Sequence, residues 1–474
     1  MSTTGQPVLV VDLDGTLIGT DLLWETFWAA LSANVARLAS VFGGGRARIK
    51  ARLAKWVELD PAALPYNQAV LQLVREWRAA GGRTALVTAS DAKYALAISE
   101  HLGLFDEVHG SDGTRNLKGG AKATFLTHRF GVTGYDYVGD SRADLPVWRG
   151  AHRAITVGVP ARLRRAVEAE CVNVEHLQAP SGSARDYFRA LRPHQWSKNL
   201  LVLLPAVLAH SYAVDIWLSA LVGFVAFCMV ASSVYLLNDL LDLAVDRAHP
   251  RKRYRPLASG AIPLIHGMAM ALLLLIGGLL CGLAVGRSEF LVVIVVYYSL
   301  TIAYSLVLKR QLIIDIFVLA GLYTIRVIAG GAASDVPLSV WLLAFSMFMF
   351  LSLAAVKRQT ELVDSVAAGN AHTFGRAYRA EDLAVVPMMA VASGYVSVLV
   401  MVLYIDSPEV KLLYENPPLL WGVAPVLLFW ISRMVMIAHR GLMHDDPIVF
   451  AWKDRISRVC GLIIVSLVIS GAFY

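Results

Sequence analysis

The sequence predicts a soluble α/β domain followed by an all-α membrane domain of nine helices. Of its 474 residues, 57% are hydrophobic and 17% are charged, whereas an ordinary soluble domain has about 25% charged residues. Residues 1–199 hold 43 of the 79 Asp, Glu, Lys and Arg, and the longer remainder holds only 36. The first part also alternates strand-like and helix-like segments. These observations exclude a purely soluble globular chain.

Net charge, cysteine spacing and the N-terminal sequence indicate which partners, sites and targeting signals to expect. An excess of Lys and Arg, here +7, is typical of cytoplasmic loops in membrane proteins, so we expect no nucleic-acid partner. The four cysteines are far apart and form no CxxC pair, which favours neither a zinc site nor a disulfide framework. The apolar run 8–11 is short and is broken by Asp12 and Asp14, so it does not resemble a signal peptide. We expect the N-terminal domain to be cytoplasmic.

Residues 1–178 are predicted to form a parallel α/β sheet. The strand-like runs are VLVVDLD, TALVTAS and YDYVGD, with helix-like segments between them. Ligands in such folds bind at the carboxyl ends of the strands. Residues 179–198 are expected to be a linker and an interfacial helix, because a stretch rich in Pro, Gly and Ser precedes a short amphipathic segment at 184–191.

Two aspartates end the first strand of this domain. The sequence DLDGT places Asp12 and Asp14 two residues apart before a glycine that permits a tight turn. One carboxylate could attack phosphorus while the other transfers a proton. The residues that accompany this pair are Thr88 at the end of the second strand, Lys122 in GGAKATFL, and Asp140 and Asp144 in YVGDSRAD.

This set of motifs, in this order over residues 7–175, resembles the haloacid dehalogenase superfamily of phosphatases. The resemblance implies that Asp12 is the nucleophile and that Asp14 is the general acid and base. It also implies that Thr88 and Lys122 orient the phosphate, with Lys118 as the alternative to Lys122. The residues that it assigns to Mg²⁺ binding are Asp12, Asp14, Asp140 and Asp144.

A mostly helical insert, residues 18–80, resembles the small cap that shapes substrate access in this superfamily. Leu22, Leu23, Trp24, Phe27 and Trp28 lie on nearby turns of its first helical segment. They either pack the cap against its own core, which we favour, or contact the membrane surface or a lipid tail. The glycine run at 43–45 is expected to be a loop.

From residue 199 onward, nine apolar segments predict membrane helices. They lie near 199–210, 216–237, 264–285, 290–307, 313–333, 339–356, 384–404, 418–437 and 457–473. With the N-terminus inside, sixteen Lys and Arg lie in or beside the four inner loops, and only Arg287 and Lys411 lie in the outer ones. This asymmetry predicts a multi-pass protein of the inner membrane with a cytoplasmic N-terminal domain.

An acidic segment follows the second of these spans, NDLLDLAVDRAHPRKRYRPLASG at 238–260. Asp239, Asp242 and Asp246 are spaced i, i+3 and i+7, so a helix would place the three carboxylates on one face. Such a face favours Mg²⁺ bridging to substrate phosphates. A positive-inside loop with offsetting acids would explain the basic residues but not this spacing. The nearby side chains expected to bind substrate are Asn238, Arg247, His249, Lys252 and Arg255.

This segment resembles the first motif, NDxxDxxxD, of the UbiA superfamily of intramembrane transferases. The resemblance covers residues 190–474 and implies a bundle of nine helices. The stretch YSLVLKRQLIID offers Tyr304 and Lys309 as substrate-binding residues and Asp315 as a metal ligand at the superfamily's second motif. That motif usually has more aspartates than this stretch provides.

Three stretches are more similar to decaprenyl-phosphate phosphoribosyltransferases than to aromatic prenyltransferases of the superfamily. They are RPHQWSKN at 192–199, DRAHPRKRYRP at 246–256 and RVIAGGAA at 326–333. Lys198 and Arg326, from these stretches, and Lys357 complete the candidate substrate-binding residues. Arg326 lies within an apolar segment, where a charge usually faces a cavity or a partner, so it faces substrate or forms a buried ion pair. Lys357 either anchors a helix at the interface or contacts phosphate.

The combined resemblance implies a bifunctional Mg²⁺-dependent membrane enzyme. One reaction would transfer 5-phosphoribose from phosphoribosyl pyrophosphate to polyprenyl (decaprenyl) phosphate, releasing pyrophosphate. The phosphatase domain would then remove the 5-phosphate from the lipid-linked product. Prenyl transfer to an aromatic acceptor is the first alternative, and a transporter or lipid-binding scaffold is the second. Membrane lipids are expected partners, and a homo-oligomer is compatible with the sequence.

Overall fold

A computed structural model of the chain describes residues 6–33, 46–112, 116–178, 182–209, 213–369, 376–408, 410, 414–443 and 446–473. The glycine run at 43–45, residues 179–181 of the expected linker and Lys411 lie outside the described residues. The chain divides into two compact units. The first contains residues 1–191 and 235–271, and the second contains residues 192–234 and 272–474. We describe each unit by itself.

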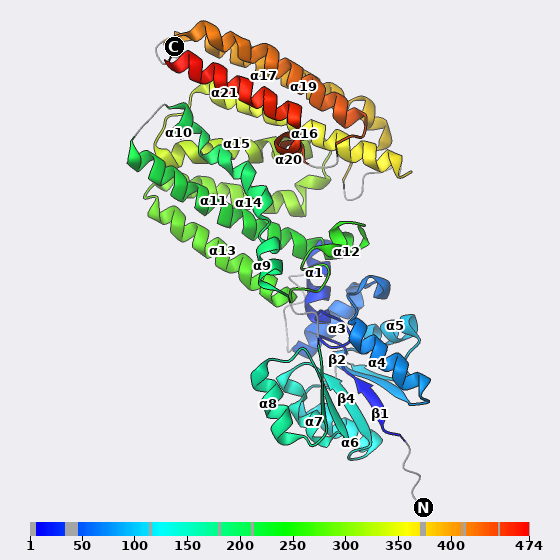
Figure 1. Ribbon diagram of the computed structural model, residues 1–474. Helices are drawn as coiled ribbons and strands as arrows, with labels where there is room; N and C mark the ends of the chain where they lie inside the picture. The colour runs from blue at the N-terminus through cyan, green and yellow to red at the C-terminus, as the bar shows by residue number, and fades with distance from the viewer. Residues whose placement is uncertain are drawn as a thin grey trace, which may run out of the picture. The chain divides into compact units, whose positions relative to one another are not determined.

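A six-stranded, fully parallel sheet forms the centre of the first unit, as the strand–helix alternation predicted (Figure 1). The strand order is β3-β2-β1-β4-β5-β6, so β1 lies between β2 and β4. Central strands of this kind are buried on both faces, which explains why β1 is the continuous apolar run VLVV. The strands are β1 (Val8–Val11), β2 (Thr84–Asp91), β3 (Glu107–Ser111), β4 (Tyr135–Gly139), β5 (Arg153–Val157) and β6 (Val174–Leu177).

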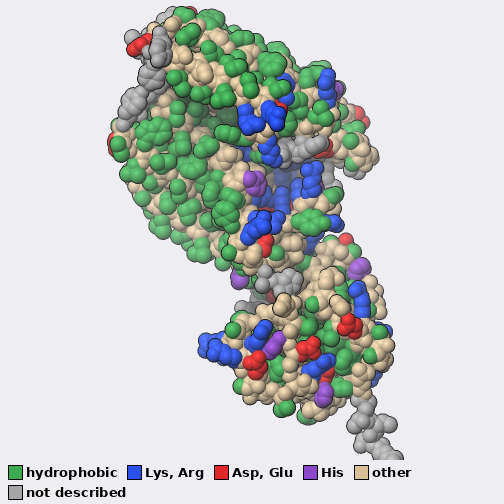
Figure 2. Space-filling view, in the orientation of Figure 1, with side chains coloured by type: hydrophobic (Ala, Val, Ile, Leu, Met, Phe, Trp, Pro, Cys, Tyr) green, Lys and Arg blue, Asp and Glu red, His purple; other side chains and the backbone are tan. Residues whose placement is uncertain are grey.

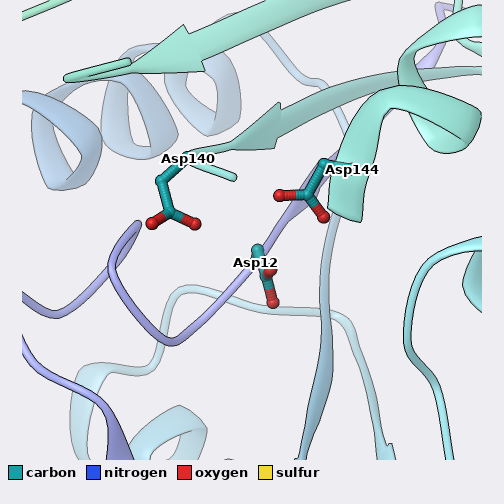
Figure 3. Close-up of side chains that lie close together, drawn as sticks. All are labelled: Asp12, Asp140 and Asp144. Atoms are coloured by element: carbon teal, nitrogen blue, oxygen red, sulfur yellow. The ribbon is translucent and has the colours of Figure 1, made fainter. Parts of the chain in front are cut away.

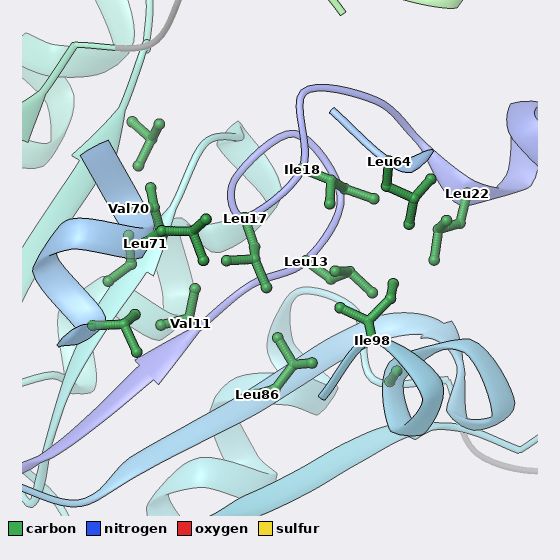
Figure 4. Packing of buried hydrophobic residues seen from close by; sticks show 14 of the residues in the cluster. Val11, Leu13, Leu17, Ile18, Leu22, Leu64, Val70, Leu71, Leu86 and Ile98 are labelled. Atoms are coloured by element: carbon green, nitrogen blue, oxygen red, sulfur yellow. The ribbon is translucent and has the colours of Figure 1, made fainter. Parts of the chain in front are cut away.

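Helices cover the sheet and bury its apolar side chains. Val70, Leu71 and Val74 of α4 pack against Val11 and Leu86 of the sheet (Figure 4). The interval 18–80 assigned to the cap therefore includes one helix that belongs to the layer on the sheet. The helices of this layer are α4 (Gln68–Ala79) and α5 (Ala92–Leu102), and the helices on the other face are α6 (Gly120–Phe130), α7 (Leu145–Gly150) and α8 (Ala161–Glu170).

The insert between β1 and α4 contains α1 (Leu22–Ala33) and α3 (Arg46–Trp56). Its aromatic side chains pack within the insert: Phe27 makes edge-to-face contacts with both Trp24 and Trp28, and Trp28 is buried. The packing interpretation of this aromatic group agrees with these contacts. Of the three rings, Trp24 also lines the cavity above the sheet.

A short helix, α9 (Ala184–Ala190), follows the linker. Ser183 caps it: its hydroxyl accepts the Asp186 N–H, and the Asp186 carboxylate accepts the Ser183 N–H. This reciprocal pairing satisfies two donors that the first turn of a helix leaves open. The first unit also contains α12 (Leu243–Ala248), which follows the end of a long membrane helix.

Within the described residues, eight helices are long and apolar enough to cross a membrane. They correspond to the last eight predicted spans. The first predicted span, 199–210, is instead a 3-10 helix, Pro193–Val202, followed by the five-residue α10 (Leu204–Leu208), so the ninth crossing is not confirmed. The long helices are α11 (Val214–Leu241), α13 (Leu264–Ala284), α14 (Ser288–Leu306), α15 (Ile314–Ser334), α16 (Val340–Ala367), α17 (Val386–Ile405), α19 (Val423–His439) and α21 (Arg455–Phe473), with the short α20 (Pro447–Lys453) before the last.

The second unit is a bundle in which α16 packs against α15, α17 and α19. Small and apolar side chains of α15 and α16, among them Ala320, Ala354 and Ala355, form its core. Large hydrophobic side chains stay exposed on the outer helices, and in Figure 2 they cover much of the bundle surface. Exposure of this kind is expected of a surface that faces lipid. The protein is therefore a multi-pass membrane protein.

Candidate active sites

Three aspartates meet at the carboxyl edge of the sheet in the first unit. Asp12 follows β1, Asp140 follows the neighbouring β4, and Asp144 lies in the short turn after Asp140. Because adjacent parallel strands end at the same edge, residues 128 positions apart converge there. Figure 3 shows the three carboxyl groups pointing toward one another, and one oxygen of each lies within 4.8 Å of the others.

This donor set fits a magnesium ion. Mg²⁺ prefers carboxylate oxygens, and three adjacent carboxylates repel one another unless a cation lies among them. Burial, and then the charges of Asp12 and Asp144, raise the pKa of Asp140 to about 8. Asp14, which the sequence also assigned to the metal, is not part of this group. Asp12, Asp140 and Asp144 are thus the residues that would hold the ion.

Lys122 supplies a positive charge beside the same carboxylates. Its Nζ lies 2.9 Å from Asp12 Oδ2 and donates to the Tyr137 hydroxyl, which in turn donates to Asp144. Burial lowers the pKa of Lys122, but the charges of Asp12 and Asp144 outweigh this effect and raise it. Lys122 is therefore cationic, and it can offset charge on a bound phosphate. Lys118, the alternative, lines the cavity above.

Asp14 lies apart from the three metal-binding carboxylates. Its carboxylate accepts the Leu22 N–H and the Ser90 hydroxyl. Burial, followed by the charge of Asp21, raises the pKa of Asp14 to about 7. A group with this pKa can give and take a proton near neutral pH, as a general acid and base must. Thr88, also predicted, is fully buried in β2, and its hydroxyl accepts the Ser90 N–H.

Gly15 permits this arrangement. Its φ is +73°, and a Cβ at this position would lie 2.2 Å from Asp140 Oδ2. We expect Gly15→Ala to displace Asp140 and to lower phosphate release from p-nitrophenyl phosphate by about 10²-fold or more, as misplacement of catalytic groups does. Colorimetric measurement with purified protein tests this.

The matched control for this substitution is Gly103→Ala. Gly103 also has a positive φ, +62°, but a Cβ there would meet nothing within 4 Å. This variant carries the backbone strain without the clash, so its phosphatase activity should stay near that of the wild type. Equal losses in the two variants would show that strain, and not contact with Asp140, is responsible.

The acidic segment of the membrane domain forms a second site. α11 ends at Leu241, and Asp242 begins the short α12. Asp239 and Asp246 are buried and converge on Arg255, whose Nη1 lies 3.1 Å from Asp239 Oδ1 and 2.5 Å from Asp246 Oδ2. Two carboxylates thus point at one cation position, now held by a guanidinium. Asp239 and Asp246 thus meet at Arg255, whereas Asp242 is half-buried, and the three do not form a group of metal-binding side chains among the described residues.

Arg247 departs from its predicted role in substrate binding. Its guanidinium donates to both carboxylate oxygens of Glu25 and to the carbonyl of Ala258. These bonds occupy the side chain, so Arg247 connects α12 to α1 within the first unit. His249 Nδ1 accepts the N–H groups of Arg251 and Lys252 and shapes the turn that carries Lys252. Asn238 is half-buried one position before Asp239.

Asp315 lies in the second unit between two arginines. Arg358 Nε is 2.9 Å from its Oδ2, and Arg376 Nη1 is 2.8 Å from its Oδ1. Tyr304 also donates to Oδ1. Asp315 is not part of a group of three or more metal-binding side chains among the described residues, and its two oxygens face guanidinium groups that it holds in place. Lys309 contributes its backbone carbonyl to Arg376, at 3.5 Å.

The two predicted lysines of the second unit share one acid. Lys198 Nζ and Lys357 Nζ lie 2.8 Å and 3.1 Å from Oδ2 of Asp446, and Tyr323 also donates to that carboxylate. The structure therefore brings Lys198 and Lys357 together from segments 159 positions apart. Two lysines beside one aspartate leave a net positive charge, which is suited to a phosphate.

Arg326 is buried within the same bundle. It donates to Asn199 and Tyr297, and its guanidinium lies 5.2–5.6 Å from the ring centres of Phe227, Tyr297 and Tyr323. Aromatic faces stabilise a buried cation without neutralising it. Aromatic rings and the Asn199 amide thus surround this guanidinium.

Residues of these networks that were not predicted include Asp446, Tyr323 and Arg376, and Arg358 was considered only beside Lys357, as an interfacial anchor or a phosphate contact. Asp446 precedes Pro447 at the start of α20. An Asp followed by Pro is typical of a helix N-cap, so the sequence alone indicates a capping role for Asp446 and not a contact with lysines. Arg358 adjoins the predicted Lys357, and the KR pair fits interfacial anchoring equally well. Their roles depend on contacts between distant segments, which spacing along the chain does not reveal.

Two family profiles match the chain in the order of these sites. A haloacid dehalogenase-like hydrolase profile matches residues 9–149, and the UbiA prenyltransferase family profile matches residues 199–451, more than half of the chain. The protein belongs to the UbiA prenyltransferase family and carries an N-terminal haloacid dehalogenase-like domain.

Relatives with this organisation and relatives of the membrane part are both known. An uncharacterised protein, y4nM of Sinorhizobium fredii, is 38% identical over 97% of this chain and 90% of its own length. Nodulation protein NoeC of Azorhizobium caulinodans is 37% identical over 58% of this chain and 89% of its own. Decaprenyl-phosphate phosphoribosyltransferase of Mycolicibacterium smegmatis is 40% identical over 39% of this chain and 59% of its own.

Proposed function

We propose that this protein catalyses two consecutive reactions on a membrane lipid. The UbiA domain transfers 5-phosphoribose from phosphoribosyl pyrophosphate to a polyprenyl phosphate such as decaprenyl phosphate, and pyrophosphate leaves. The haloacid dehalogenase-like domain then hydrolyses the remaining 5-phosphate and leaves a lipid-linked ribose. The domains are residues 1–178 and 199–474, joined by 179–198.

The observation that carries this proposal is a group of three carboxylates and a lysine, side chains suited to phosphate hydrolysis, on the same chain as the UbiA domain. Asp12, Lys122, Asp140 and Asp144 form this site. A phosphoribosyl product still carries a phosphate that such a site can remove. The product of prenyl transfer to an aromatic acceptor carries none. Linking the two sites in one chain also raises the effective concentration of the intermediate.

In the transferase reaction, Asp239, Asp242 and Asp246 would hold Mg²⁺, which neutralises charge on the leaving pyrophosphate. The C1–O bond to pyrophosphate breaks, and the ribose acquires oxocarbenium character. An oxygen of the lipid phosphate then forms the new bond to C1. In the second unit, Lys198, Lys357 and Arg326 are the basic residues that we propose bind substrate phosphate.

In the phosphatase reaction, Asp12 attacks phosphorus with a carboxylate oxygen, and the bond between phosphorus and the ribose 5-oxygen breaks. Asp14 gives its proton to that oxygen. Water then attacks the aspartyl-phosphate, Asp14 takes a proton from the water, and inorganic phosphate leaves. Lys122 offsets the negative charge of the phosphoryl group throughout.

We also propose that the N-terminal domain faces the cytoplasm and that the protein resides in the inner membrane. The distribution of Lys and Arg between the predicted loops, sixteen against two, supports this orientation.

The test uses the full-length protein in nanodiscs with Mg²⁺, polyprenyl phosphate and labelled phosphoribosyl pyrophosphate. We expect mass spectrometry of the lipid fraction to show lipid-linked ribose, and chelation of Mg²⁺ to abolish it. A preparation that labels no lipid, but joins a polyprenyl diphosphate to an aromatic acceptor, would replace this proposal with aromatic prenyl transfer.

A further inference from the structure

The cavity beside the phosphatase residues is also lined by residues between 259 and 266, which follow the aspartates of the acidic segment in the sequence. This cavity, about 590 Å³, contains Asp12, Asp14 and Lys122 on the side of the sheet. Tyr187 of α9 and residues 259–261 and 263–266 line the same cavity. All of these residues belong to the first unit. We call segment 259–266 together with Tyr187 the outer wall.

The outer wall is firmly attached to the phosphatase domain. Gly260 has a φ of +75°, and a Cβ there would lie 3.0 Å from the Gly19 carbonyl oxygen and 3.1 Å from Pro65 Cβ. A Cβ on Gly182 would lie 2.5 Å from the carbonyl oxygen of Ala261. Backbone therefore packs directly on backbone at both places, where only glycine fits.

An ion pair holds the residue that precedes the wall. The Arg247 guanidinium, buried with Glu25, also donates to the Ala258 carbonyl at 2.8 Å. The wall is thus fixed to α1 at one end. At the other end, the Tyr187 hydroxyl and His266 Nδ1 form a hydrogen bond of 2.7 Å.

The same wall begins a membrane-spanning helix. Leu264, Ile265 and His266 form the first turn of α13, which is long and apolar enough to cross a membrane. A molecule that places a phosphate at Asp12 and extends past this turn reaches the end of a transmembrane helix, which lies at the membrane surface. The polar tips of Tyr187 and His266 can meet a sugar, and the exposed Ile265 can meet an adjoining lipid chain.

We propose that the outer wall makes this phosphatase site selective for a phosphomonoester carried on a membrane lipid, with Tyr187 and His266 as specificity-determining residues. The inference rests on the proposed phosphatase function of Asp12. Contacts with the part of a substrate that does not react raise turnover by stabilising the transition state. A soluble sugar phosphate lacks the lipid part and is turned over more slowly.

The test compares three substrates with full-length protein in nanodiscs: a synthetic farnesyl-phosphoryl ribose 5-phosphate, ribose 5-phosphate and p-nitrophenyl phosphate. We expect kcat/KM for the lipid substrate to exceed that for ribose 5-phosphate by about 10²-fold. Tyr187→Phe and His266→Ala should each lower the ratio of lipid to p-nitrophenyl phosphate turnover about tenfold. His128→Ala, an exposed histidine of α6 outside the cavity, is the matched control.

The possible outcomes distinguish failure of the proposed lipid selectivity from failure of the proposed phosphatase function. Equal turnover of lipid and soluble sugar phosphates would overturn the selectivity while leaving the phosphatase function intact. Parallel losses on lipid and p-nitrophenyl phosphate in the Tyr187 and His266 variants would assign these residues a structural role and would also overturn it. If the wild type hydrolyses none of the three substrates in an Asp12-dependent way, the phosphatase function itself fails.

Discussion

Asp12→Asn is expected to convert the final product from lipid-linked ribose into lipid-linked phosphoribose. The amide cannot attack phosphorus, and loss of a nucleophile lowers turnover by about 10⁴-fold or more. The transferase residues lie elsewhere, so lipid labelling itself should continue. Mass spectrometry of the labelled lipid detects the retained phosphate directly.

The control for this variant is Asp60→Asn. Asp60 is an exposed cap of a short 3-10 helix in the same domain, and Asn caps equally well. It should yield lipid-linked ribose as the wild type does. Dephosphorylated lipid from Asp12→Asn at the wild-type rate would show that Asp12 is not the nucleophile.

Asp239→Asn is expected to abolish labelling of lipid altogether. Asp239 and Asp246 are buried and converge on one cation position, and an amide in place of one carboxylate removes half of the negative charge there. We expect the transfer rate to fall by about 10³-fold, as when a main electrostatic contributor is removed. Radiolabel in the extracted lipid measures this rate.

Asp215→Asn is the matched control because Asp215 is exposed at the opposite end of the same helix, α11. It should transfer phosphoribose normally. Asp239→Asn should still release phosphate from p-nitrophenyl phosphate, which shows that the protein is folded. Undiminished lipid labelling by Asp239→Asn would exclude the acidic segment from the transferase site.

Much of the fold was predictable because the relevant signals are local. Apolar runs such as VLVV mark buried parallel strands, and eight of the nine apolar segments correspond to long helices. The first segment does not form one long helix. Pro193 lies at the start of a 3-10 helix and Pro205 at the start of α10, so two short helices occupy the place of the expected span. The aspartates after β1 and β4 were predictable because strand ends share one edge of the sheet.

The roles of other candidate site residues could not be predicted, because they are set by contacts between segments far apart in the sequence. Arg247 was assigned to substrate because it lies in a basic run, yet its partner Glu25 is 222 positions away. Asp315 was assigned to a metal, yet Arg358 and Arg376 approach it from other segments. A sequence reveals that charges are present, but pairing between them is decided by packing.

The Glu25–Arg247 pair has a consequence for how this chain can evolve. Both side chains are buried, with 3% and 7% of their surfaces exposed, and removing one partner of a buried ion pair costs about 3–5 kcal/mol. A mutation at either position alone is therefore selected against, while an exchange of both for apolar residues is tolerated. Positions 25 and 247 should change together among descendants that retain the fusion, although one belongs to a hydrolase module and the other to a transferase module.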